Sequence, residues 1–198
     1  ATDADGTILF FVVSKQGGVH RITNHDEVDA KEELVLELNV CENGERGIQT
    51  ILAHPDFDGV NNRWIYIYYS PWIDDVCKLD LDYDDSGGAY NVLSRFLWDG
   101  SAIDKDSEEQ LLRSPKTTHN VHNGGAMVFG KDGYLYIALG EGGSVVPPVS
   151  QWDHTLLGKM LRLTEDGGIP SSNPYADTGV RCHEKGETKE GKQCQEIF

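Results

Sequence analysis

Short runs of apolar residues, separated by Gly, Asp or Asn, recur along the whole chain. The runs are rich in β-branched and aromatic residues, which favours strands over helices. Helical periodicity is confined to residues 31–38 and 151–157, each long enough only for a short turn of helix. We therefore predict an all-β protein, with strands over residues 7–13, 19–22, 34–38, 64–69, 92–97, 126–129, 134–138 and 160–163.

Turn signals between these runs indicate how the strands connect. Gly17-Gly18 and Asp132-Gly133 tolerate the positive φ angles that two-residue hairpin turns require, so the strands they join are expected to be antiparallel. Short strands with tight turns are typical of a β-sandwich, a closed barrel or a β-propeller. Repetition favours the propeller, because an Asp-Gly pair precedes an apolar strand at residues 132–138 and, in weaker form, at residues 5–13.

The length suits part of a propeller rather than a closed ring. A four-stranded blade takes about 40 to 50 residues, so the 198 residues supply three to four blades once the long polar loops are set aside. Residues 195–198 are typical of a strand rather than of a polar tail. We therefore expect a single propeller domain over residues 1–198 that is incomplete at its C-terminus and exposes a sheet face and an apolar channel wall.

Charge and hydropathy exclude two classes of partner. The chain has 17 Lys+Arg and 33 Asp+Glu, a formal net charge of −16. Nucleic-acid binding depends on basic residues that displace phosphate counterions, so a nucleic-acid partner is not expected. No stretch approaches the ~20 apolar residues that span a bilayer. Residues 1–6 also lack the features of a signal peptide, so the protein is expected either to be cytosolic or to have lost a leader.

The four cysteines bear on that choice. None of them forms a CxxC pair, which argues against a zinc ribbon or a thioredoxin-type site. Cys182 and Cys194 lie in a polar segment rich in Lys, Glu and Gly, where a cross-link would hold the loop. We expect disulfides and an oxidising compartment, while four free thiols in a cytosolic protein remain the alternative. We expect Cys41 to pair with Cys77 and Cys182 with Cys194, which is one of three possible pairings.

Three glycine-punctuated loops carry the candidate chemistry: residues 43–47, 119–125 and 140–143. In a propeller, loops at one end of the blades converge on the central channel, where small ligands bind. Each loop would bring an ionisable group to that mouth, namely Glu45 or Arg46, His122 and Glu141. Glycines beside these groups allow a flat ligand to approach the backbone closely.

His122 is the sharpest candidate, because a neutral imidazole can take a proton from a hydroxyl group near physiological pH. Two other interpretations stay open: a histidine that only hydrogen-bonds a neighbouring carbonyl, and a metal site shared with His119, for which no third ligand is evident. Glu141 could bind a ligand hydroxyl or close a turn, and Glu45 with Arg46 could form an ordinary surface pair.

An acidic segment over residues 80–87 has the carboxylate spacing of a calcium loop. It has Asp85 at the sixth position, where such loops need Gly, and Asn91 at the twelfth, where they need Glu. A solvated hairpin tip is the better interpretation, and we predict no metal ligands within this chain.

Taken in order, several segments resemble the glucose/sorbosone dehydrogenase family, the soluble quinoprotein sugar dehydrogenases, and most closely its bacterial aldose sugar dehydrogenase branch. One departure lies at residues 48–50, where Ile-Gln-Thr replaces the two leucines and a glycine usual in the family. The resembling segments cover residues 45–47, 54–57, 63–70, 94–96, 122–125, 129–143, 151–153, 157–163 and 169–175.

The resemblance implies a six-bladed β-propeller, of which this chain holds about the first half to two-thirds. It also implies that pyrroloquinoline quinone (PQQ) and Ca²⁺ lie in the central channel, and that the C1 hydroxyl of an aldose is oxidised to a lactone, with electrons passed to a further acceptor. By the same likeness His122 is the general base. The expected cofactor contacts are Glu45, Arg46 and Asn123, and the expected substrate contacts are Glu141 and Gln151.

The remaining cofactor contacts, including the Ca²⁺ ligands, are expected beyond residue 198, so this chain by itself is expected to be inactive. A secreted or periplasmic enzyme is the favoured interpretation. The alternative is a non-catalytic extracellular propeller, similar to that of hedgehog-interacting proteins, which binds a protein partner. A disulfide-tied loop at Cys182 and Cys194 would suit such a binder, whereas His122 and Glu141 at the channel mouth favour the enzyme.

Overall fold

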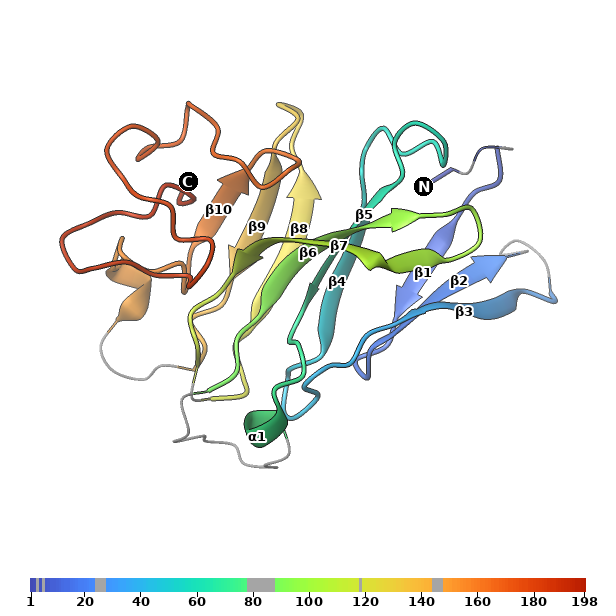
Figure 1. Cartoon of the computed structure of the whole chain (residues 1–198), viewed down its shortest axis with the longest axis horizontal. Coiled ribbons are helices and arrows are strands. Elements are labelled where there is room, and N and C mark those ends of the chain that lie inside the picture. Colours follow the sequence, from blue (N-terminus) through green and yellow to red (C-terminus); the bar gives the residue numbers. More distant parts are fainter. Residues whose placement is uncertain (3, 5, 24–27, 78–87, 118, 144–147) are drawn as a thin grey trace.

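In the computed structural model, which describes residues 1–2, 4, 6–23, 28–77, 88–117, 119–143 and 148–198, three antiparallel sheets follow one another along the chain (Figure 1). The first contains β1 (Phe10–Val13), β2 (Gly18–Thr23) and β3 (Lys31–Glu37) in that order. The second contains β4 (Ile48–Ala53), β5 (Trp64–Tyr69), β6 (Val92–Trp98) and β7 (Ile103–Arg113). The third contains β8 (Gly124–Phe129), β9 (Leu135–Leu139) and β10 (Met160–Leu163).

Helix is confined, within the described residues, to α1 (Asp74–Cys77) and the 3₁₀ turn η1 (Val149–Gln151). The all-β prediction is confirmed. The short helical turn that periodicity allowed at residues 31–38 does not form, because residues 31–37 pair with β2 as an edge strand. This strand overlaps the one predicted over residues 34–38. The turn predicted at residues 151–157 overlaps η1 only at Gln151.

Two strands escaped the sequence pattern. β7 reads as a charged loop, since its sequence IDKDSEEQLLR has a long polar stretch. It is a strand because β6 supplies hydrogen-bonding partners along one side. β7 forms the outer edge of the second sheet, where its polar side chains are exposed to solvent. Charged edge strands also discourage pairing with other chains. β4, with the sequence IQTILA, pairs with β5 on the opposite edge of the same sheet.

β5 is buried on both of its faces. Ile65 and Ile67 belong to the core between the first and second sheets. Tyr66 and Tyr68, which alternate with them, belong to the core between the second and third sheets. Because successive side chains of a strand point to opposite faces, one strand joins both cores, and the second sheet is packed between its neighbours.

The first strand of each sheet lies innermost. β1 contacts β4, and β4 contacts β8, while the outer strands β3 and β7 also touch. The three sheets therefore fan out from a row of inner strands, as Figure 1 shows. This is the arrangement of blades in a partial β-propeller, as the sequence predicted.

The outermost faces of the first and third sheets are apolar and exposed. Phe10 and Val12 of β1 are about half exposed, as are Val128 of β8 and Met160 of β10. On the third sheet these side chains border a groove of about 470 Å³. The exposed sheet faces expected of a partial propeller are thus present.

Both disulfides form as paired in the sequence analysis. Cys41 bonds to Cys77 and Cys182 bonds to Cys194, so the four-free-thiol alternative is wrong. Within the described residues, no helix is long and apolar enough to cross a membrane.

Leu93→Ala tests the packing of the second sheet against the third. Leu93 is fully buried, and removing a buried leucine side chain costs about 2–5 kcal/mol of unfolding free energy. Leu34→Ala is the matched control, because Leu34 is half exposed and its loss should cost less than about 1 kcal/mol. Urea denaturation of the two variants checks the difference, and equal losses would contradict the packing described.

Candidate active site at the loop ends of the second and third sheets

The structure brings the three glycine-punctuated loops together. The loop of residues 43–47 precedes β4, residues 119–123 precede β8, and residues 140–143 follow β9. The Glu45 amide donates to the Asn120 carbonyl at 2.8 Å, and the Gly142 amide donates to the His122 carbonyl at 3.1 Å. Residues distant in sequence therefore form one continuous loop cluster.

Glycine is required where these loops touch. A Cβ atom at Gly140 would lie 1.8 Å from the His122 carbonyl oxygen, far inside van der Waals contact. At Gly125 a Cβ atom would lie 2.2 Å from the Tyr68 ring. These two glycines thus allow close approach within the protein itself, a role that the sequence pattern had not distinguished from ligand access.

His122 has an unusual backbone conformation. Its φ of 58° makes it the only non-glycine residue with positive φ among the described residues. This left-handed conformation costs roughly 1–2 kcal/mol for a residue with a Cβ atom. The His122 amide donates to the Glu45 carboxylate at 2.6 Å. Strain of this kind concentrates at functional sites, where the surrounding structure holds it in place.

The His122 imidazole is paired through one nitrogen and open at the other. Nδ1 hydrogen-bonds the Glu141 carboxylate, and the side chain is 57% exposed. Within the described part of the chain, no hydrogen bond reaches Nε2. The hydrogen bond and charge of Glu141, helped by the charge of Glu45, raise the pKa of His122 above its ordinary value of 6.5. Partial burial by itself would raise the pKa of Glu141. The hydrogen bonds that the carboxylate accepts, above all the one with His122, outweigh burial and lower this pKa below its ordinary value.

Arg46 and Asn123 lie beneath this surface. The Arg46 guanidinium is buried and donates to the carbonyls of Thr117 at 3.1 Å and His119 at 3.0 Å. Asn123 is buried, and its Oδ1 accepts a hydrogen bond from Asn91 at 3.1 Å. Both side chains hold the loops together, and their predicted contact with a cofactor stays a prediction.

Gln151 stands apart from the cluster, at the end of η1, with its side chain exposed. Lys159 fixes this turn, because its ammonium group donates to the carbonyls of Val149 at 3.3 Å and Ser150 at 2.9 Å. The Gly158 amide in turn donates to the Gly140 carbonyl at 3.0 Å. η1 is thus tied to the loop of Glu141, and the substrate role of Gln151 stays a prediction.

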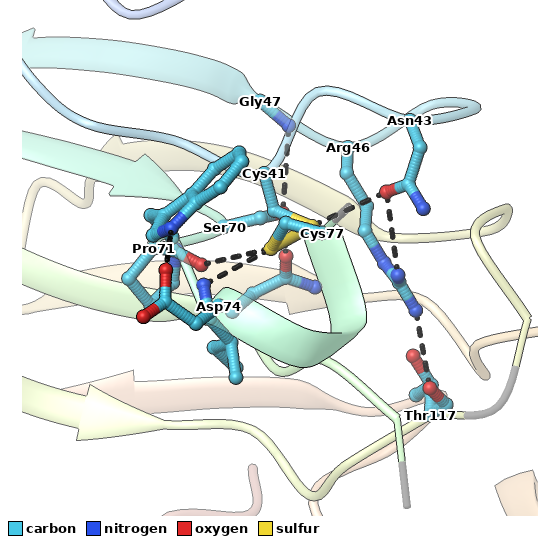
Figure 2. The surroundings of a disulfide bond; sticks show 12 residues. Cys41, Asn43, Arg46, Gly47, Ser70, Pro71, Asp74, Cys77 and Thr117 are labelled. Atoms are coloured by element: carbon cyan, nitrogen blue, oxygen red, sulfur yellow. Dashed lines mark hydrogen bonds between the residues drawn. A yellow bond between two sulfur atoms is a disulfide. The ribbon is translucent and has the colours of Figure 1, made fainter. Parts of the chain in front are cut away.

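The Cys41–Cys77 disulfide anchors the base of the loop that carries Glu45. Figure 2 shows the bond joining this loop to α1, with Arg46 reaching from the same loop to Thr117. The Cys41 amide also donates to the Ser70 carbonyl at 2.9 Å. The loop is therefore held at one end by a covalent bond and at its centre by a buried cation.

The metal-site interpretations gain no support. Among the described residues, the one group of His, Cys, Asp and Glu side chains close enough to hold an ion is Cys182, Cys194 and Glu196, and its cysteines form a disulfide. His119 and His122 are not in such a group. The acidic segment of residues 80–87 lies outside the described residues.

Comparison with known proteins agrees with the fold. The sequence model of the Glucose / Sorbosone dehydrogenase family matches residues 1–184. The chain belongs to the glucose/sorbosone dehydrogenase family. Within this family, it is 32% identical over 144 residues to aldose sugar dehydrogenase YliI of Escherichia coli, covering 72% of this chain and 35% of that protein.

One further curated relative and one solved structure are also similar to this chain. Hedgehog-interacting protein of Homo sapiens is 26% identical over 184 residues, covering 86% of this chain and 25% of that protein. The structure of the PQQ-bound form of aldose sugar dehydrogenase from Streptomyces coelicolor aligns with a TM-score of 0.65 at 23% identity, over 94% of this chain and 48% of that one. This family member thus spans about half of that structure, and a quarter to a third of the two curated relatives.

The left-handed conformation of His122 predicts an unusual stability order. His122→Gly should be more stable than His122→Ala by about 0.5–1 kcal/mol, because glycine adopts positive φ without strain. At the neighbouring Val121, where φ is not positive, the order should reverse, since glycine gains more entropy on unfolding. Thermal denaturation of the four variants checks this, and the same order at both positions would contradict it.

Proposed function

We propose that the protein containing this chain oxidises the C1 hydroxyl of an aldose to the lactone, with His122 as the general base. Membership of the sugar dehydrogenase family supports the reaction class. The observation that carries the proposal is the His122 imidazole, whose Nδ1 lies on the Glu141 carboxylate and whose side chain is largely exposed.

This pairing suits proton transfer. In the neutral imidazole, Nδ1–H points to Glu141, so the lone pair of Nε2 faces outward and can accept the proton of a sugar hydroxyl. Glu141 holds the tautomer and ring orientation and stabilises the imidazolium that forms. Glu141 is thereby a positioning residue for the base in this proposal, in addition to the sugar contact that the resemblance implies.

The charge of the cluster favours a neutral substrate. Glu45 and Glu141 place two carboxylates beside His122, and the chain carries a net charge of −16. This field disfavours sugar phosphates and sugar acids, whereas sugar hydroxyls can donate hydrogen bonds to carboxylates. A neutral aldose is therefore the substrate class that we propose.

The cofactor proposal depends on relatives. PQQ, whose quinone would supply the two-electron acceptor, is named in the Streptomyces coelicolor structure. The described loops do not fit its carboxylates, because they present Glu45 and Glu141, while the Arg46 guanidinium is buried against backbone carbonyls. We place the cationic contacts and the Ca²⁺ ligands outside the described residues, as the resemblance implies.

Two disulfides support an oxidising compartment, so a secreted or periplasmic location is part of the proposal. The second candidate function is an extracellular binder of a protein partner. The match to hedgehog-interacting protein over 86% of this chain favours it, as does the disulfide-tied segment of Cys182 and Cys194. A strained, carboxylate-paired histidine is not needed for such a role, and we place the enzyme first.

His122→Ala tests the base. In the native polypeptide that carries this chain, supplied with PQQ and Ca²⁺, dye-linked aldose oxidation should fall on the order of 10²–10⁴-fold in kcat. His20→Ala is the matched control, because His20 also pairs through Nδ1 with a carboxylate, that of Glu32 at 2.9 Å, on the first sheet. Unchanged kcat in His122→Ala would refute the assignment, and a wild type that oxidises no aldose would favour the binder.

Glu141→Gln tests the pairing through its pH dependence. The base must be neutral, so kcat/KM falls as pH drops below the pKa of His122. Because Glu141 raises that pKa, removing its charge should move the acidic limb of the pH profile to lower pH. Glu32→Gln should leave the profile unchanged, and an unmoved limb in Glu141→Gln would contradict the pairing.

A further inference from the structure

We propose that a directed chain of buried polar side chains, Ser70–Asn91–Asn123, holds His122 in its left-handed conformation, with Asn91 as the central positioning residue. The reason why this matters, that His122 is the base, rests on the proposed function. The positioning itself does not depend on which reaction is catalysed.

The hydrogen bonds run in one direction. The Ser70 hydroxyl donates to Asn91 Oδ1 at 2.5 Å, and Asn91 Nδ2 donates to Asn123 Oδ1 at 3.1 Å. Asn123 Nδ2 then donates to the Asn120 carbonyl at 3.4 Å. Each amide thus uses its oxygen toward one neighbour and its nitrogen toward the next, so reversing one amide would oppose like groups along the chain.

Because these side chains are buried, each of their polar groups must keep its hydrogen-bond partner. Ser70, Asn91 and Asn123 are 0%, 4% and 5% exposed. A buried polar group that loses its partner incurs the full desolvation penalty, because water cannot replace the lost hydrogen bond. The chain is therefore expected to tolerate neither a missing donor nor a rotated amide at Asn91.

The hydrogen bond from Asn123 to Asn120 holds the backbone on both sides of His122. Asn120 and Asn123 flank this residue in sequence, and their hydrogen bond ties residues 120–123 into a tight turn. The Asn123 carbonyl is also held, since it accepts from the Tyr68 hydroxyl at 3.3 Å and from the Gly140 amide at 3.2 Å. These hydrogen bonds fix the turn of residues 120–123, while the His122 side chain remains exposed.

The first link connects the chain to the loop of Glu45. Ser70 Oγ accepts from the Gly47 amide at 3.5 Å and from Gln49 Nε2 at 3.4 Å. Its own proton is therefore directed to Asn91. The same polar chain thus supports both the loop that carries the base and the loop whose carboxylate accepts the His122 amide.

Asn91→Leu in the native polypeptide that carries this chain tests the inference, with the histidines isotope-labelled and the His122 signals assigned by His122→Ala. If Asn91 positions His122, the turn relaxes, the imidazole leaves Glu141, and its titration by NMR shifts to lower pH. Exchange of the His122 amide, now released from Glu45, should accelerate by at least about tenfold, the change expected for one lost hydrogen bond.

Asn173→Leu is the matched control. Asn173 is also 5% exposed and bonded through both ends of its amide, but its partners are Arg162 and Gln195 on the third sheet and the C-terminal segment. It should lower stability and leave the titration and amide exchange of His122 unchanged. An Asn91→Leu variant that folds with wild-type titration and exchange would overturn the inference.

If Asn91→Leu does not fold, Ser70→Ala decides, because it removes the donor that orients Asn91 and leaves the Asn91 side chain in place. It should change the titration and exchange of His122 in the same direction, and wild-type values would overturn the inference. In the aldose assay, kcat should fall with KM unchanged. A shifted titration in a protein that oxidises no aldose would refute the proposed function and leave the positioning role standing.

Discussion

Strand β5 carries large side chains on both faces, and the rest of the structure depends on covering both. The first sheet covers Ile65 and Ile67, and the third sheet covers Tyr66 and Tyr68. At roughly 25 cal/mol per Å² of apolar surface, leaving either face in water would cost several kcal/mol. The second sheet is therefore enclosed between two others, and the inner strands are set side by side.

That packing places the candidate site. Because β4 lies against β8, the loops that precede these strands meet, and the Glu45 carboxylate reaches the His122 amide. Glu141 arrives from the end of β9, which is antiparallel to β8 and so ends beside its start. The Cys41–Cys77 disulfide and buried Arg46 then limit how far the first of these loops can move.

The site combines backbone strain at His122 with a chain of hydrogen-bonded, buried amides beneath it. A left-handed histidine and a chain of buried amides persist because the surrounding contacts over-determine them. Features of this kind are typical of function rather than of packing. Arg46 and Asn123 stand next to exposed site residues in sequence, yet both are buried and hydrogen-bonded within the loops.

Local sequence determined the strands and hairpins whose apolar pattern is strong, such as β5 and β9, because alternation and turn residues act over a few positions. It did not predict β7, whose charged residues form a strand only because β6 offers them partners. It also left a helical turn open at residues 31–38, of which residues 31–37 pair with β2. The propeller and the candidate residues came from repetition and family resemblance together. Only the tertiary structure decided that His122 pairs with Glu141 and that Asn91 supports the turn beneath it, because these contacts join residues from separate strands and loops, brought together by sheet packing.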